Sequence, residues 1–426
     1  MSTSNKTGTT ADTPLAITVQ SHRSAIPLLV AIGILYAAFG IVLGLLQGGL
    51  PPLLRSRGFD IGSIGWLFAI LLPFGLTFLW APLVDSIPLS RKTPRVAWIL
   101  AAQAVSIIVL LAIAATETVH PAILFGLALT VAFAAATMDV ALDALSVTAV
   151  PPSYRPVAAS LKLCALSLGA IIGGGVFVAL SHRLGWQSLF LGFAVLMFFA
   201  PLPLVFNRDY DAPMSDIAPL RASLLVTLRR TGNGRQLALL AFTSCVLFAL
   251  FSLNRIMLVD VKVPLAKIGW IVGTLTPLCG LAASAIAAPL LTRLGPQRSI
   301  LAFAAISITS VGLMLFGLQT HVQAWCIVGT ISVNGGVSGF YVVICATILG
   351  WARSQQPATD YAALFGISRL ISTIFLIGLT QLLPFIGWSI FYVGAIVALL
   401  AAVLLLHRFR AEFTSQFVDE KRFVGQ

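Results

Sequence analysis

Two aspartates lie four residues apart in a stretch that is otherwise apolar. Asp139 and Asp143 occur in "AATMDVALDALSV", and residues at this spacing share one face of a helix. A carboxylate at the centre of a bilayer costs about 2.5 to 3.5 kcal/mol on insertion scales. Such a pair therefore needs protonation, a cationic partner or contact with water. Lys162 is the nearest cation along the following helix, and it shares a face with Gly169 and Gly173, which would let a neighbouring helix approach closely.

Two interpretations of these three charged groups remain open. In the first, Asp139, Asp143 and Lys162 form a titratable cluster that exchanges a proton or organises a gate. In the second, they are a salt-bridge network that holds two helices together and contacts no solute. Asp143 lies nearer the end of its segment, which favours the structural role for that residue.

The composition indicates a membrane protein. Hydrophobic residues make up 58% of the chain, charged residues only 9%, and the mean hydropathy is +1.00. A membrane-spanning helix needs about 20 apolar residues, and the apolar runs do not alternate as those of a β-barrel would. We therefore predict an all-α membrane protein with twelve transmembrane helices, at 26–48, 63–84, 96–115, 121–143, 157–180, 188–206, 237–258, 266–290, 299–318, 323–349, 361–382 and 386–407.

The positions of Lys and Arg indicate the orientation. With the N-terminus inside, most of the 26 basic residues fall on the cytoplasmic side, where membrane insertion retains them. In this count Arg255 is assigned to the outer side. The net charge of +12 is thus a topology signal and no indication of nucleic acid binding.

An internal repeat divides the chain into two halves. "SIGWLFAILLPFGL" returns as "KIGWIVGTLTPLCGL", which aligns Gly65 and Trp66 with Gly269 and Trp270. A polar stretch rich in Pro and Gly separates the halves. The predicted organisation is a cytoplasmic N-terminal tail, a six-helix bundle, a cytoplasmic linker, a second six-helix bundle and a cytoplasmic C-terminal tail, at 1–24, 25–206, 207–236, 237–407 and 408–426.

Other polar residues within the predicted helices could contact a solute. Arg369, the counterpart of Lys162 in the second half, lies deep in its segment and would suit an anionic group, or else a structural partner on another helix. Further candidates for substrate binding, which could equally be interhelical hydrogen-bond links, are Gln47, Asn254, Asn334 and Tyr36.

The loop after the second predicted helix combines an acid with several cations. We predict a cytoplasmic conformational latch formed by Asp85, Arg91, Lys92 and Arg95.

The sequence contains no phosphate-binding Gly loop that ends in Lys-Ser/Thr and no His-Glu-x-x-His motif. We therefore expect no enzymatic activity, no cofactor and no drive by ATP within this chain. The five cysteines are widely spaced within predicted helices, so neither a disulfide framework nor a metal site is expected.

Two motifs resemble a known family. "TFLWAPLVDSIPLSRK" and "ATMDVALDALSVTAVPPSYRPVAASLKLCALSLGAIIGGG" resemble the muropeptide-permease-like branch of the major facilitator superfamily. Within it, the chain is most similar to siderophore-associated permeases of the pyochelin and rhizobactin importer type and to the yersiniabactin-associated transporter. The resemblance implies two six-helix bundles around a central cavity, in the bacterial inner membrane. The chain departs from the family pattern at Asp85, which Ser86 follows in place of a base, and at Thr292, which replaces an acid.

The absence of a nucleotide-binding loop favours a secondary transporter driven by an ion gradient, with protons as the expected ion. The narrower resemblance implies that it imports a metal–siderophore complex of iron or zinc. The expected partners are this small-molecule substrate, protons and the lipid bilayer, with no nucleic acid, and the chain is expected to be a monomer. Two alternatives remain: a permease for muropeptides or another amphiphilic solute, and a transporter-like sensor or assembly factor.

Overall fold

The computed structural model describes residues 26–116, 121–150, 154–206, 208–211, 233–351 and 357–409. All regular secondary structure in these ranges is helical, and none of it is a strand. This confirms the predicted all-α fold. The predicted N-terminal tail, most of the linker and nearly all of the C-terminal tail lie outside the described residues.

The elements of the first half begin with a long helix that changes its winding. Its first part, α1, continues through a π-helical turn, η1, into α2, so that the described chain begins with one apolar stretch, Ile26–Ser56. The bounds are α1 (Ile26–Gly44), η1 (Leu45–Gly49), α2 (Leu50–Ser56), α3 (Ile61–Leu67), η2 (Phe68–Leu71), α4 (Leu72–Leu76), η3 (Thr77–Leu79), α5 (Ala81–Ser86), α6 (Pro94–Ala114), α7 (Pro121–Ala149), α8 (Arg155–Ala170), η5 (Ile171–Val176), α9 (Phe177–Phe199) and α10 (Leu202–Phe206).

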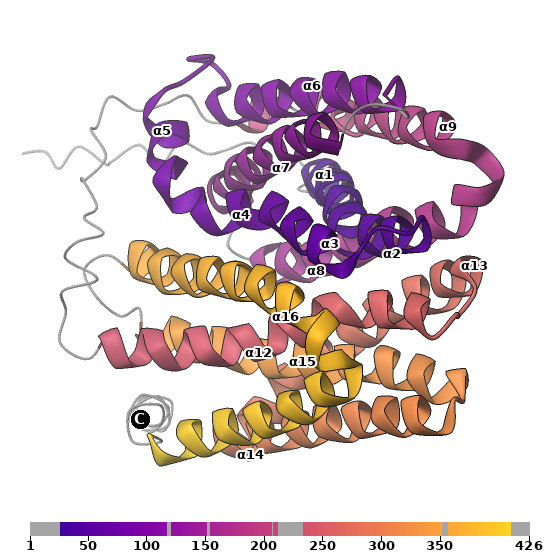
Figure 1. The fold of residues 1–426 in the computed structure, drawn as a ribbon. Coiled ribbons are helices and arrows are strands. Elements are labelled where there is room, and N and C mark those ends of the chain that lie inside the picture. Colours follow the sequence, from indigo (N-terminus) through magenta and orange to yellow (C-terminus); the bar gives the residue numbers. More distant parts are fainter. Residues whose placement is uncertain are drawn as a thin grey trace, which may run out of the picture.

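The rest of the described chain has fewer and longer elements. They are η6 (Arg208–Tyr210), α12 (Asn233–Asp260), α13 (Leu265–Lys267), η7 (Ile268–Val272), α14 (Gly273–Thr320), α15 (Gln323–Trp351) and α16 (Pro357–Arg408). Figure 1 shows the elements up to α10 as one layer of helices and those from α12 to α16 as a second layer against it.

Eleven stretches of the described residues are long and apolar enough to cross a membrane. One of them, Leu364–Arg408, has 45 residues, about twice the length that a bilayer requires. It contains the chain reversal at Gly387, the second residue of the last predicted span, so it comprises the last two predicted spans.

Glycine allows α1 and the helix of α8 and η5 to pack with their backbones in contact. A Cβ atom at Gly169 would collide with the carbonyl oxygen of Ala37, and one at Gly173 with the carbonyl oxygen of Ile41. The predicted glycine face therefore lies against α1. Because Lys162 is on the same face, this packing brings its side chain to α1.

The repeated motif has the same structural role in both halves. Gly65 of α3 lies against Thr380 of α16, and Gly269 of η7 lies against Ala179 of α9. In each case a Cβ atom would collide with the opposite half. The internal repeat thus marks two places where a helix of one half lies directly against the other half.

Three helix reversals share one backbone geometry. Gly185, Gly295 and Gly387 have φ of 73°, 78° and 74° and ψ of 168°, 169° and 167°. This region of backbone space is open almost only to glycine. These glycines end one membrane helix and begin the next without a longer loop.

We predict that Gly387→Ala lowers the stability of the protein by about 1 to 3 kcal/mol, because alanine would be strained at this positive φ. Gly378→Ala is the matched control: at both glycines an added Cβ would have no atom within 4 Å, and only Gly387 has a positive φ. The control should be neutral or stabilising, since alanine favours a helix. Thermal unfolding of the purified variants in detergent measures both, and equal midpoints would contradict the assignment of strain.

Candidate functional site

The predicted carboxylates and their cation lie together. Lys162 Nζ is 2.5 Å from Asp143 Oδ1 and 3.5 Å from Asp139 Oδ1. Tyr36, on α1, donates its hydroxyl hydrogen to the same oxygen of Asp143 at 2.5 Å, and Lys162 Nζ lies 4.7 Å from the centroid of its ring. The cluster therefore joins α1, α7 and α8. Tyr36, a candidate for substrate binding from the sequence, is buried in this cluster and does not line the central cavity described below.

The two carboxylates have different partners. Asp143 Oδ1 accepts hydrogen bonds from both Lys162 and Tyr36. Asp139 Oδ1 is buried and has no hydrogen-bond partner among the described residues, although Lys162 is within ion-pair distance. The Asp143 side chain is 50% exposed and that of Asp139 26%. This arrangement suits a structural role for Asp143 and leaves Asp139 as the carboxylate with an unused acceptor.

A central cavity lies between the two halves. It has two adjoining parts of about 250 and 420 Å³. Both parts are lined by residues from each half, and the residues common to both are Gln47, Leu163, Phe251, Ser284 and Ser338. Asp139, Asp143 and Lys162 are not among its lining residues, but Leu163 follows Lys162 directly on α8.

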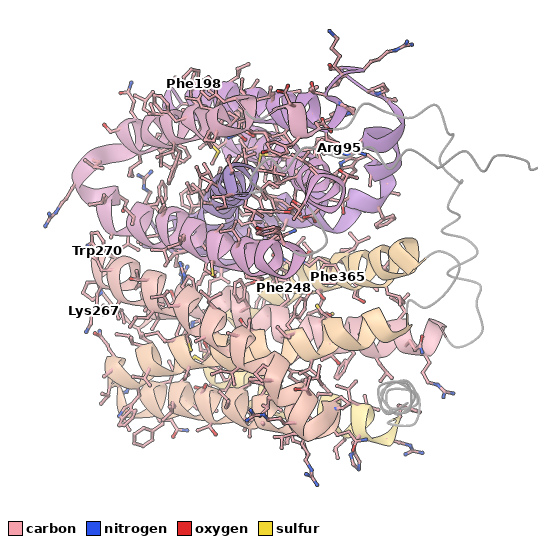
Figure 2. The ribbon with its side chains drawn as sticks, turned by 180° about the vertical axis from the view of Figure 1, so that it is seen from behind. Arg95, Phe198, Phe248, Lys267, Trp270 and Phe365 are labelled. Atoms are coloured by element: carbon pink, nitrogen blue, oxygen red, sulfur yellow. The ribbon has the colours of Figure 1, made fainter. Side chains whose placement is uncertain are left out.

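Three of the candidates for substrate binding line this cavity. Gln47 contributes to both parts, Asn334 to the smaller part and Arg369 to the larger. The guanidinium carbon of Arg369 lies 4.0 Å from the centroid of the Phe248 ring, and Figure 2 shows Phe248 between the two layers of helices. That Gln47, Asn334 and Arg369 bind the solute stays a prediction.

Asn254 lies elsewhere. It is buried within the second half, where its amide donates to the carbonyl of Leu250 and its Oδ1 accepts a hydrogen bond of 3.0 Å from the Tyr392 hydroxyl. The bond to Tyr392 joins α12 to α16, and it is an interhelical link of the kind that was the alternative role predicted for Asn254.

Arg255, counted on the outer side from the sequence, is a residue of the central cavity. It lies within α12, five residues before the helix ends, and its side chain lines the central cavity. Nη1 donates to the carbonyl oxygens of Gly48 at 2.8 Å and Gly174 at 3.0 Å, both in the opposite half. Arg255 falls within the predicted span 237–258, so it should have been counted as an intramembrane cation, as Arg369 was.

The cavity also contains polar groups that the sequence did not single out. The hydroxyl of Thr276 lines its smaller part and is buried without a hydrogen-bond partner among the described residues. Tyr341 lines its larger part. No Asp or Glu occurs among the described residues that line either part. The fixed charges of the cavity are therefore the two arginines.

One end of the interface is closed by polar contacts between the halves. Arg55 Nε of α2 is 2.6 Å from Asp260 Oδ1 of α12, and Trp388 Nε1 donates to Asp260 Oδ2 at 2.8 Å. Nearby, Gln381 Nε2 donates to the carbonyl of Gly62 at 2.9 Å. We call this region, where α2 and α13 lie on the right of Figure 1, the closed end.

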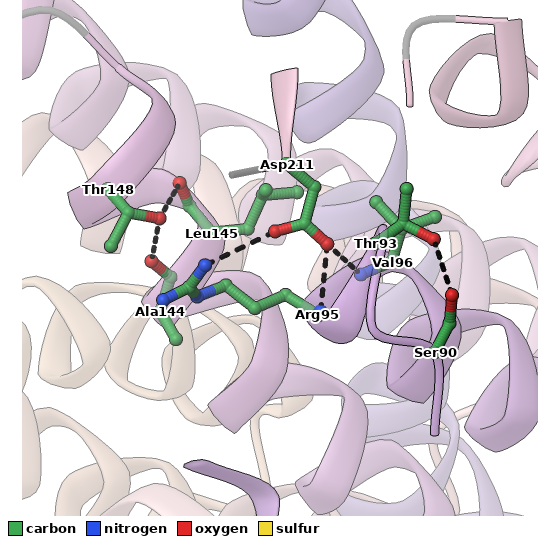
Figure 3. Close-up of polar contacts among 8 residues, drawn as sticks. All are labelled: Ser90, Thr93, Arg95, Val96, Ala144, Leu145, Thr148 and Asp211. Carbon is green, nitrogen blue, oxygen red and sulfur yellow. Dashed lines mark hydrogen bonds and ion pairs between the residues drawn. The ribbon is translucent and has the colours of Figure 1, made fainter. Parts of the chain in front are cut away.

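The predicted latch residue Arg95 has a partner in the first residues of the linker. Asp211 accepts hydrogen bonds from the backbone N–H groups of Arg95 at 2.8 Å and Val96 at 3.0 Å, and from Arg95 Nη1 at 3.2 Å (Figure 3). The Asp211 side chain is buried, and it caps the N-terminus of α6 from a distance in sequence. Arg91 and Lys92 are exposed, whereas the side chain of Asp85 lies outside the described ones.

Two helical halves around a cavity that both of them line define a membrane transporter of the two-bundle class. The chain belongs to the Major Facilitator Superfamily, whose family model matches residues 31–258.

Relatives and solved structures agree with this assignment. The chain is 26% identical over 424 residues to the anhydromuropeptide permease of Escherichia coli, covering 91% of this chain and 79% of the relative. It is 24% identical over 387 residues to the putative transporter AmpG 4 of Rickettsia felis, covering 86% and 92%. The fold is similar to a crystal structure of the POT family transporter PepTSo, with a TM-score of 0.68 and 12% identity over 90% of this chain and 98% of that one. It is also similar to a bacterial homologue of the human lysosomal transporter Spinster, with a TM-score of 0.62 and 16% identity over 92% and 97%.

These comparisons support the resemblance to muropeptide permeases. They give no support to the narrower resemblance to siderophore-associated permeases.

We predict that Lys162→Gln destabilises the protein because it leaves two neighbouring carboxylates without their cation. The expected loss is about 1 to 3 kcal/mol, below that for a fully buried pair because these side chains are partly exposed. The double variant Lys162→Gln/Asp143→Asn should recover much of the loss, since it removes one of the two negative charges. Thermal unfolding measures both variants, and a double variant less stable than the single one would contradict this charge balance.

We predict that Asp260→Asn opens the closed end, because it removes the charge that holds Arg55 across the interface. Asp60→Asn is the control: Asp60 lies at the same end, but its described hydrogen bonds come from Ser63 of its own half, whose hydroxyl and N–H, with a smaller contribution from Arg55, keep the pKa of that carboxyl below its ordinary value. Distances between spin labels on α2 and α13 should lengthen or broaden in Asp260→Asn alone. Unchanged distances would show that the ion pair does not hold this end.

Proposed function

We propose that the chain is a secondary transporter of the bacterial inner membrane, with both termini in the cytoplasm, that carries an anionic amphiphilic solute of the muropeptide kind. One observation carries the proposal: the central cavity is lined by Arg255 and Arg369 and by no described carboxylate.

Fixed cations within a membrane are costly unless they have a partner. Arg255 donates to two backbone carbonyls of the opposite half, whereas Arg369 stacks on the Phe248 ring and bonds the Tyr341 hydroxyl, and both of these aromatic residues line the cavity. A carboxylate of the solute would form charge-assisted hydrogen bonds with a guanidinium, which are about twice as strong as neutral ones. Arg369 is therefore the residue we assign to the anionic group.

The rest of the cavity suits an amphiphilic solute. Its larger part is lined by Phe248, Phe251 and Tyr341, and hydroxyl and amide groups lie among them, including those of Gln47 and Ser338. Aromatic rings pack on apolar or sugar faces, and the polar groups can bond hydroxyls. A muropeptide combines sugar rings, hydroxyls and peptide carboxylates.

The name of the relative that spans most of this chain favours this cargo over the metal–siderophore complex that the narrower resemblance implied. A metal chelate with free carboxylates has related chemistry, so it belongs in the same assay.

The cluster of Asp139, Asp143 and Lys162 supports coupling to protons. With both acids ionised, one cation faces two anions, and the cluster has a net negative charge that one proton would neutralise. Asp139, with its unused acceptor, is the residue we assign to that proton. The cluster adjoins the cavity wall at Leu163, so a change in its charge acts on a helix that contacts the solute.

Uptake of labelled anhydromuropeptide into cells that lack their own permease tests the proposal. Arg369→Gln should reduce uptake about tenfold or more, the effect expected for one lost charge-assisted hydrogen bond. Arg298→Gln, which removes an exposed cation outside the set of lining residues, is the control and should transport normally. Asp139→Asn should lose the accumulation that a protonophore abolishes, with folded protein retained.

A metal–siderophore complex is the second substrate in this assay. Its uptake in place of the muropeptide would overturn the proposed cargo, and uptake of neither would overturn the proposed transport. Accumulation in Asp139→Asn that remains sensitive to a protonophore would remove the proton role from this residue.

A further inference from the structure

A second large cavity lies within the first half. Its volume is about 650 Å³, in the range of cavities that hold small molecules. Helices of five predicted spans surround it, and none of its lining residues also lines the central cavity. The lining is almost wholly apolar, and it includes Leu46, Leu50, Leu67, Leu110, Phe125 and Phe190.

The margin of this cavity is lined by a cation and aromatic rings. Arg57, directly beyond the end of α2, lies there, with its guanidinium carbon 5.2 Å from the centroid of the Trp186 ring. Its side chain is exposed, and no described carboxylate is within ion-pair distance of it. Trp66, which is 62% exposed, and Phe59 also contribute to the lining. Tryptophan and arginine at the end of a membrane helix are typical of the level of the lipid headgroups.

We propose that this cavity binds a phospholipid of the surrounding bilayer, with an acyl chain among the apolar side chains and the phosphate at Arg57. An apolar cavity of this kind does not hold water well, and left empty it would lose packing contacts along its whole lining. An acyl chain restores those contacts. The guanidinium stacks on Trp186 and has no described carboxylate within ion-pair distance, so its planar donors suit a phosphate.

The position of this cavity connects the proposed lipid with the closed end of the interface between the halves. Leu45, Leu46 and Leu50 of η1 and α2 line the lipid cavity, whereas Gln47 and Gly48 of the same segment line the central cavity. Five residues beyond Leu50, the same helix carries Arg55, which pairs with Asp260 at the closed end. A bound lipid therefore supports the helix that closes one side of the transporter, and it favours the closed arrangement of this end.

Native mass spectrometry of the full chain, purified in mild detergent with phospholipid, tests the binding. Arg57→Gln removes the phosphate partner, and Ala128→Phe places a ring at a buried position of the lining. Each should reduce the phospholipid retained per protein at least threefold. Lys267→Gln is the control, because Lys267 is an exposed cation of the second half that does not line the cavity; Figure 2 shows it near Trp270.

Thermal unfolding gives a second test, which measures lipid binding in the wild type as well as in variants. Added phosphatidylglycerol or phosphatidylethanolamine should raise the unfolding midpoint of the wild type, and the rise should shrink by half or more in Trp66→Ala. Trp270→Ala, at the matching place in the repeat and also exposed, should keep it. Inorganic phosphate alone should have no effect. The proposal is overturned if both cavity variants retain as much phospholipid as the wild type, or if phosphate alone reproduces the stabilisation.

Discussion

The bilayer requires that each buried charge and polar group find its partner within the protein, and most of this structure follows from that constraint. Lys162 lies between two acids because α7 and α8 each bring a charge that lipid would not tolerate. It reaches Tyr36 because glycines let α8 lie against the backbone of α1. Arg255 meets the same requirement differently, since its partners are carbonyls of the other half. The ionic cluster and the contact between the halves are thus two solutions of one problem.

The contacts between the halves are of two kinds, and they suit different tasks. The glycine contacts at Gly65 and Gly269 bring the two halves close together and involve no charged group. The Arg55–Asp260 pair is polar and is made only when its two side chains meet. The first kind fixes where the halves touch, and the second kind favours one of their arrangements.

Local patterns in the sequence predicted the parts of the site that lie on one helix face. The spacing of Asp139 and Asp143 and the shared face of Lys162 and Gly169 depend only on helical geometry. Contacts that depend on tertiary structure left no such pattern: nothing in the sequence indicates that Tyr36 reaches Asp143. Asp211 similarly caps α6 from the beginning of the linker. Because it is distant from α6 in the sequence, the local sequence around α6 does not predict this cap. The helical fold itself was predictable because it depends on the length of each apolar stretch, and this length does not depend on which helices pack against one another.

The cluster that we propose as the proton site and the cavity that we propose as the solute site adjoin each other along α8, and this gives the first a route by which to act on the second. Lys162 turns toward α1 and the acids, and Leu163 turns toward the cavity. In the proposed coupling, a proton that neutralises the cluster weakens the attraction of Lys162 for α7 and so loosens the helix that forms one wall of the cavity. Another part of the wall, η1, is a π-helical turn between α1 and α2, a type of distortion that often occurs where a helix must adapt to function. The cavity is thus bordered by the helix that carries the proposed proton site and by a π-helical turn at which the first helix can change its shape.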